Sequence, residues 1–182
     1  MALALALAGP DVNGSSLKWP GVAGGRGEPT GNSGTTQEKT MGKIRAVQPK
    51  PEEAATMPYA PAVSLEMPAE LIFISGATAS PLYHQHPHVA AEHVQPDDIR
   101  EQTRRAMENI KIVLDHKGLT WRNIVKVTKF LTDMREADAM HEVMNSYFGD
   151  WRPASTTVCI NNLSSPGARI EIEMIAAGPL TN

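Results

Sequence analysis

The chain divides into an unpatterned N-terminal stretch and a patterned remainder. Residues 1–55 are rich in Gly, Pro, Ser and Thr and show no apolar period, which predicts a disordered tail or a leader. From residue 56 to residue 182, alternating and amphipathic segments follow one another with short turns between them. We therefore predict a tail over residues 1–55 and one folded domain over residues 56–182.

Apolar periodicity predicts two helices and five strands in this domain, in the order β-β-α-β-α-β-β. The predicted strands cover residues 63–66, 71–75, 124–131, 156–160 and 170–176, and the predicted helices cover residues 97–117 and 136–148. The first helix is the best defined, because Pro96 precedes it and Gly118 follows it. The short Met67-Pro68-Ala69 connection predicts that the first two strands form a hairpin.

Helices that connect strands favour right-handed crossovers, which place both helices on one face of a single mixed sheet. The predicted fold class is therefore α+β, with the second face of the sheet uncovered. In the last strand, isoleucine and glutamate alternate, so Arg169, Glu171 and Glu173 are expected on the uncovered face. In the strand before it, Ser155, Thr157 and Cys159 are expected on that face too, while Val158 and Ile160 face the helices. Such a face is either solvated or an association surface.

Composition and charge exclude several classes of protein. A net charge of −3, a pI near 6.1 and 5% aromatic residues argue against a nucleic-acid partner. The single cysteine, Cys159, excludes an internal disulfide and favours a reducing, cytoplasmic location. No apolar run approaches the roughly 20 residues that span a membrane. The opening MALALALAGP lacks a basic segment, so an organellar leader is a weaker alternative.

Three groups of residues carry candidate chemistry. Glu171 can act as a base that orients water or as an ordinary ion-pair partner, and Arg169 can bind an anion or form an ion pair. The segment PLYHQHPHVAAEH contains four histidines, at positions 84, 86, 88 and 93. It can form a polar surface loop, a transition-metal site, or a loop over a pocket in which a histidine such as His84, or Tyr83, contacts the substrate.

Several short sequence motifs, taken together, indicate one family. They are MPYAPAV, LIFISGA, the QT and N of REQTRRAMENI, GLTWRNIVKVTKFLTDM, PASTTV and RIEIEMIA. Over residues 57–177 the chain resembles the RidA family, also called the YjgF or UK114 family, of small enamine and imine deaminases. This resemblance implies a chorismate-mutase-like fold and a homotrimer with pockets at the subunit interfaces. It also implies hydrolysis of a reactive enamine or imine to a carbonyl compound and ammonia, without a cofactor.

The resemblance also assigns roles to residues of this chain. Glu171 corresponds to the glutamate that positions the attacking water, and Thr157 to a residue whose backbone carbonyl helps to hold that water. Tyr59, Ser75, Gly76, Ser155 and His141 stand at positions that the resemblance places in the pocket. Arg169 and His84 are further candidates for the pocket from the residue pattern described above.

Two of these positions depart from the family. Ser155 stands where the family has an arginine that clamps a carboxylate, and His141 where it often has an asparagine. A serine supplies neither the charge nor the bidentate geometry of an arginine. The expected substrate is therefore not 2-aminoacrylate but a different imine, such as an aminomuconate-type compound. The alternative function is a non-catalytic trimer that binds a small molecule.

Overall fold

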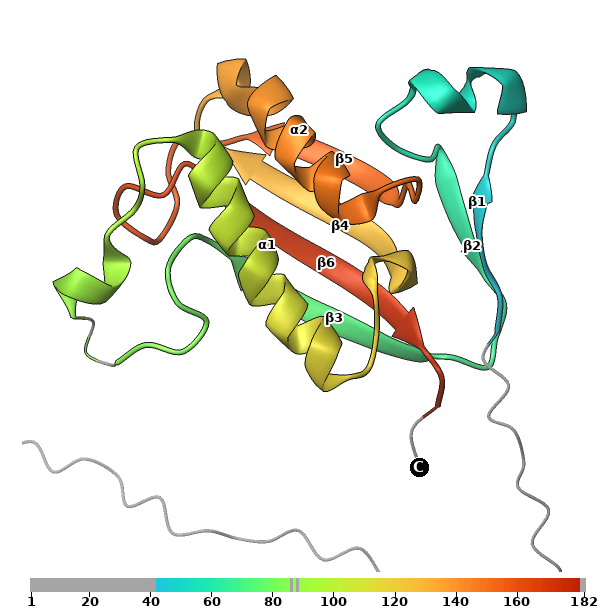
Figure 1. The fold of residues 1–182 in the computed structure, drawn as a ribbon, viewed down its shortest axis with the longest axis horizontal. Coiled ribbons are helices and arrows are strands. Elements are labelled where there is room, and N and C mark those ends of the chain that lie inside the picture. The colour runs from blue at the N-terminus through green and yellow to red at the C-terminus, as the bar shows by residue number, and fades with distance from the viewer. Residues whose placement is uncertain (1–41, 86, 88, 181–182) are drawn as a thin grey trace, which may run out of the picture. The chain divides into compact units, whose positions relative to one another are not determined.

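The computed structural model describes residues 42–85, 87 and 89–180 (Figure 1). The strands are β1 (Ile44–Val47), β2 (Ala62–Leu65), β3 (Glu70–Ala77), β4 (Ile124–Leu131), β5 (Ala154–Cys159) and β6 (Ile170–Gly178), and the helices are α1 (Ile99–His116) and α2 (Ala137–Phe148). No helix within these residues is both long and apolar enough to cross a membrane.

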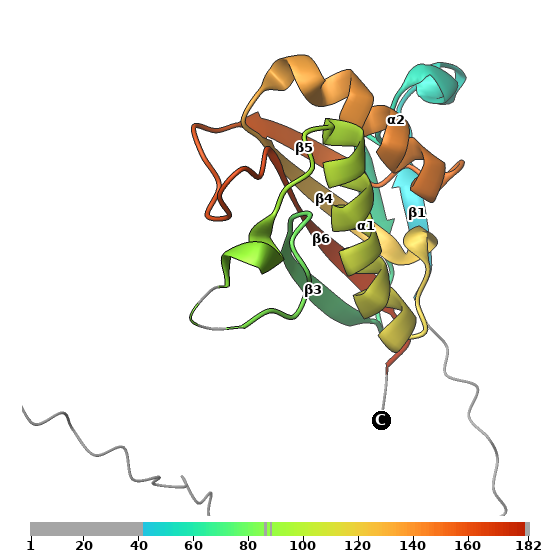
Figure 2. The same cartoon turned by 60° about the vertical axis from the view of Figure 1, so that its left-hand side comes forward.

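Four strands form the main sheet, in the order β3-β6-β4-β5. β6 pairs antiparallel with β3 and β4, while β4 and β5 run parallel. Both helices lie against one face of this sheet (Figures 1 and 2). The predicted α+β class, with two helices on one face of a mixed sheet, is confirmed.

Local sequence explains where the helices begin and end. The Asp98 carboxylate caps α1 by accepting a hydrogen bond from the Arg100 amide at 2.9 Å. Gly118 and Gly149 follow α1 and α2 with φ of 65° and 62°, a backbone conformation that a side chain disfavours.

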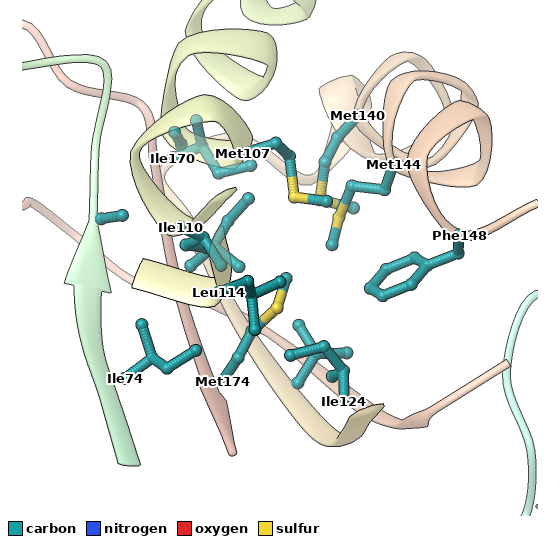
Figure 3. Close-up of a cluster of buried hydrophobic side chains, with 14 of the residues drawn as sticks. Ile74, Met107, Ile110, Leu114, Ile124, Met140, Met144, Phe148, Ile170 and Met174 are labelled. Carbon is teal, nitrogen blue, oxygen red and sulfur yellow. The ribbon is translucent and has the colours of Figure 1, made fainter. Parts of the chain in front are cut away.

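The core lies between the helices and the sheet (Figure 3). It contains Met107, Ile110 and Leu114 of α1, Met140, Met144 and Phe148 of α2, and Ile74, Ile124, Ile170 and Met174 of the strands. Flexible methionines fill irregular space between two helices that cross a twisted sheet. This core fixes which face of each strand the helices cover and leaves the opposite face of the main sheet without a helix.

The predicted hairpin is wrong. β2 pairs antiparallel with β1 in a separate two-stranded sheet, whereas β3 pairs with β6. β1 and all but the last residue of the 3₁₀ turn Pro51–Thr56 lie in the segment predicted to be a tail, so regular structure begins at Ile44 and not near residue 56. The first 41 residues, including the expected leader, lie outside the described residues.

The predicted faces are confirmed for β6 and wrong for β5. In β6, Ile170 and Ile172 are fully buried and Glu173 is exposed. In β5, Ser155, Thr157 and Cys159 pair in register with Val127, Lys129 and Leu131 of β4, which are all buried on the helix side. Paired residues share a face, so Ser155, Thr157 and Cys159 lie on the helix side. β5 is an edge strand that is only partly covered, so Val158 remains 38% exposed and its apolar character is no guide to the core.

Candidate active site

Glu171 and Gly76 meet where β3 ends against β6. The pairing of these strands shifts between Ile74 and Ala77, which marks a β-bulge. A Cβ atom built on Gly76 would lie 1.9 Å from Oε1 of Glu171. The carboxylate therefore rests directly on the backbone of Gly76, and only a glycine permits this approach.

We expect Gly76→Ala to lower about tenfold any turnover that depends on Glu171, because the new methyl group displaces the carboxylate and small displacements of a reacting group are costly. The clash involves only the end of a flexible side chain, so the melting temperature should change little. The double variant Gly76→Ala/Glu171→Asp, with a carboxylate one methylene shorter, should recover part of the activity. Full activity in Gly76→Ala would show that the contact is unimportant.

Glu171 and Gly76 line a cavity of about 180 Å³. Its other lining residues come from the β3–α1 segment, from α1 and from the β5–β6 loop: Ala77, Thr78, Ser80, Pro81, Leu82, His84, His93, Asn109, Ser164 and Ser165. Sites for drug-sized ligands are usually about 300–1,000 Å³, so this cavity suits a molecule of a few carbon atoms. Both loops lie at the same end of the main sheet (Figures 1 and 2).

A network of polar side chains fixes the cavity wall. The buried hydroxyl of Ser80 lies 3.0 Å from Oγ of Ser165 and 3.4 Å from Nδ1 of His93, and it accepts a hydrogen bond from Nε2 of Gln95 at 2.7 Å. On α1, Nδ2 of Asn109 donates to the backbone carbonyl of Ser80 at 2.6 Å. The network joins the β3–α1 segment to the β5–β6 loop, so the wall is held from two sides.

His84 and His93 bring imidazole rings to the same cavity as Glu171. Their ring centroids are 4.9 Å apart in an edge-to-face arrangement. Tyr83, by contrast, is 87% exposed and is absent from the lining. His86 and His88 lie outside the described residues, and within the described part of the chain no three His, Cys, Asp or Glu side chains are grouped to hold a metal ion.

The other predicted site residues lie away from this cavity in a single chain. Ser75 contributes to a second cavity on the uncovered face, and Tyr59 is exposed ahead of β2. Ser155 and Thr157 lie on β5 and His141 on α2. Of the site residues predicted from the sequence, only Glu171, Gly76 and His84 line this cavity in the described part of a single chain.

Of the two roles considered for Arg169, an anion contact or an ion pair, the structure shows an ion pair. Its Nε donates to Oε2 of Glu136 at 2.9 Å, and its guanidinium also bonds the backbone carbonyl of Asp97. With these partners occupied, the guanidinium does not face the Glu171 cavity.

A second unusual group lies beneath α2. Nζ of Lys129, a residue that is only 4% exposed, is 3.1 Å from Nε2 of His141. Burial lowers the pKa of Lys129 to about 8, with a smaller contribution from the charge of Lys126. Burial, and then the charge of Lys129, also lower the pKa of His141.

Sequence reasoning missed Lys129 and most of the polar network. Lys129 sits in KVTKF, where a lysine in a strand normally points to water. Ser80 and Ser165 are 85 residues apart in the chain, and no local pattern links them. Asn109 could have been identified from the sequence, because it is the asparagine of the REQTRRAMENI motif that contributes to the family resemblance.

The sequence model of the family described as Endoribonuclease L-PSP matches residues 50–178. A Yersinia pestis structure titled as a member of the conserved Rid protein family is 31% identical, with a TM-score of 0.51 over 65% of this chain and 86% of that one. This chain belongs to the RidA/YjgF family. A RidA/YjgF fold is also seen in a putative endoribonuclease from Thermotoga maritima, which is 32% identical, with a TM-score of 0.51 over 70% of this chain and 91% of that chain.

Curated RidA/YjgF relatives carry several names. A goat protein named 2-iminobutanoate/2-iminopropanoate deaminase is 33% identical over 129 residues, which are 70% of this chain and 86% of that protein. The mitochondrial protein Mmf2 of Schizosaccharomyces pombe is 42% identical over 109 residues, 59% of this chain and 79% of that protein. A RutC family protein of Pyrococcus abyssi is 42% identical over 79 residues, 43% of this chain, so the chain spans 61% of that relative's length.

Proposed function

We propose that this protein hydrolyses a small reactive imine or enamine to a carbonyl compound and ammonia, without a cofactor. The observation that carries this proposal is the Glu171 carboxylate, held against the Gly76 backbone inside a cavity of about 180 Å³. Relatives 33% and 32% identical, from goat and cattle, are named 2-iminobutanoate/2-iminopropanoate deaminases. A carboxylate beside imidazole rings in a small cavity supplies the groups that this reaction requires.

In the proposed reaction, Glu171 accepts a hydrogen bond from water and directs its oxygen to the carbon of the C=N bond. As the new C–O bond forms, one proton of the water passes to Glu171, and the nitrogen takes a proton from His84 or His93, whose rings line the same cavity. In the resulting tetrahedral carbinolamine the nitrogen takes the proton held by Glu171, and the C–N bond breaks to release ammonia. The hydroxyl proton returns to the imidazole, which leaves a carbonyl group. Overall, one imine and one water give one carbonyl compound and one ammonia.

We further propose that the protein works as a homotrimer with a small-molecule substrate and that the uncovered sheet face lies at the subunit interface. This face exposes 73% of Phe73 in the single chain, and Leu71 on the same strand is also exposed. Exposed apolar groups of this size favour burial against another subunit. We propose that the interface also includes the β5 edge of the sheet, so that Tyr59, Ser155 or Thr157 of one copy lies near Glu171 of another.

The substrate is proposed to differ from 2-aminoacrylate, with an aminomuconate-type imine as one possible class. Ser155 lies partly buried on β5 and offers a hydroxyl in place of a guanidinium fork. Loss of such a charge-assisted contact costs about 1.5–3 kcal/mol in binding, so a substrate that depends on it would bind at least about tenfold more weakly.

The proposal is tested by following ammonia release from freshly generated imines that differ in chain length and charge. The purified protein should accelerate the release from at least one imine well above the rate in buffer. If no imine reacts faster, while metabolites still raise the melting temperature, the protein is the non-catalytic binder of the alternative function. That alternative is favoured by one observation, the serine at position 155.

A further inference from the structure

Among the described residues, the cavity that contains Glu171 has one fixed negative charge and no fixed positive charge. Its lining includes the Glu171 carboxylate but no lysine or arginine. None of the ion pairs in the described part of the chain includes Glu171. His84 and His93 also line the cavity, and an unperturbed imidazole is mostly neutral above pH 7. A substrate with an acid group would therefore meet a second carboxylate without a counter-ion, and like charges repel strongly where water is partly excluded.

Asn109 adds an uncharged hydrogen-bond acceptor to this lining. Its Nδ2 group donates one hydrogen bond to the backbone carbonyl of Thr78 at 3.0 Å and one to the backbone carbonyl of Ser80 at 2.6 Å. A carboxamide has two N–H donors, and both partners here are acceptors, so the NH₂ group must face them. The group of Asn109 that remains for a ligand is the acceptor Oδ1.

The serine hydroxyls of the cavity wall use their protons on one another. Nε2 of Gln95 donates to Oγ of Ser80 at 2.7 Å and to Oγ of Ser165 at 3.3 Å. Oγ of Ser80 lies 3.0 Å from Oγ of Ser165 and 3.4 Å from Nδ1 of His93. The arrangement in which Ser165 donates to Ser80 and Ser80 donates to His93 satisfies all of these contacts. Both hydroxyl protons are then used inside the wall, and neither is left for a substrate carboxylate.

The residues that the proposed assembly brings near the cavity supply no cation. Tyr59, Ser155 and Thr157 are uncharged at neutral pH. Arg169 is already bonded to the Glu136 carboxylate and to a backbone carbonyl. The cavity therefore favours a ligand that donates hydrogen bonds and carries no negative charge.

We propose that the substrate is an imine whose carbon chain has no acid group, as formed from a small primary amine by an amine oxidase and dioxygen. This substrate class rests on the proposed function and narrows it, because imino acids and aminomuconate-type compounds are disfavoured. The N–H of the imine, and then the N–H bonds of the carbinolamine, donate to Oδ1 of Asn109 while Glu171 holds the water. The uncharged chain lies against the apolar part of the lining, which is Ala77, Pro81 and Leu82.

The test compares two imines that differ in the acid group alone. Butan-2-imine has a methyl group where 2-iminobutanoate has a carboxylate, and each is generated in the assay from its amine by an oxidase, dioxygen and catalase. At about pH 7.5, kcat/KM of the parent, measured from ammonia release above the rate in buffer, should be about tenfold or more higher for butan-2-imine. Equal values, or a higher value for 2-iminobutanoate, would overturn the inference and leave the proposed hydrolysis intact.

A cation added at the rim of the cavity provides a matched pair of variants. Ser164 is exposed and lines this cavity, whereas Asn162 is exposed on the same loop and lines a different one. Ser164→Lys should reduce the preference for butan-2-imine about fivefold or more, by raising kcat/KM for 2-iminobutanoate. Asn162→Lys should keep the preference of the parent. The same preference in all three proteins would show that charge in this cavity does not select the substrate.

Calorimetric titration with two stable compounds separates this inference from the proposed function. Butan-2-amine, a cation with N–H donors, should bind the parent and should bind Glu171→Gln about tenfold or more weakly. The anion 2-oxobutanoate should bind the parent more weakly than the amine and should gain affinity in Ser164→Lys. If this pattern is found but neither imine reacts faster than in buffer, the cavity selects against an acid group and the proposed hydrolysis is wrong. If 2-oxobutanoate binds the parent more tightly than the amine, the inference fails whatever the rates.

Discussion

Glu171→Gln should lower the rate of the proposed imine hydrolysis about 100-fold and leave the fold intact. The amide has the shape of the carboxylate but no charge, and it cannot accept a proton from the attacking water. General acid–base groups typically contribute about 10²–10⁴ to the rate. The side chain lies on the uncovered face of β6, with the backbone of Gly76 beside it, so an isosteric change leaves the core untouched. Ammonia release under steady-state conditions measures the effect.

Glu173→Gln is the matched control for this prediction. Glu173 lies two residues further along β6 on the same face, and it is exposed and lines a different cavity, with Ser75 and Lys126. Its rate should equal that of the parent. If both variants lose activity equally, the effect comes from the general charge of this face; if neither does, Glu171 has no catalytic role.

The sequence correctly predicts the buried face of a strand where one face is fully buried and the other is exposed. In β6, alternate residues are fully buried against the helices, so the isoleucine-glutamate pattern reports the correct faces. In β5, neither face is fully covered, and apolar alternation misassigned them. β1 has four residues with only one of them partly buried, which leaves no apolar period for sequence reasoning to detect. The hairpin prediction failed because connection length permits a pairing but does not select between two available partners.

In the candidate site, too, the sequence predicts individual residues but not the contacts between residues that lie far apart in the chain. Gly76 and Glu171 were expected from the resemblance, but their contact depends on the shifted register of β3 against β6. The cavity wall depends on Ser80 and Ser165, which lie far apart in the chain and meet only when two loops pack at one end of the sheet. Contacts that span the fold carry no period in the sequence, so structure is needed to find them.

Lys129→Met should raise the free energy of unfolding by about 3 kcal/mol at pH 7. Burial lowers the pKa of Lys129 from 10.5 to about 8, and each pKa unit corresponds to about 1.36 kcal/mol of differential interaction. Below pH 8 the folded protein must hold the charged ammonium in a buried place, whereas the unfolded chain holds it in water. The apolar variant avoids this cost, as replacement of buried charges by apolar side chains often does.

The pH dependence gives an independent measure of the same effect. Between about pH 8 and 10.5 the unfolded chain binds a proton at Lys129 that the folded protein has lost, so the stability of the parent should rise with pH in this window. Urea unfolding across this range should show the rise in the parent and in Lys126→Met, and a flatter profile in Lys129→Met. The charged groups that act on this site are Lys126 on the same strand and His141 and Asp138 on α2. A less stable Lys129→Met with an unchanged pH profile would contradict this prediction, because it would mean that the folded protein already pairs this ammonium.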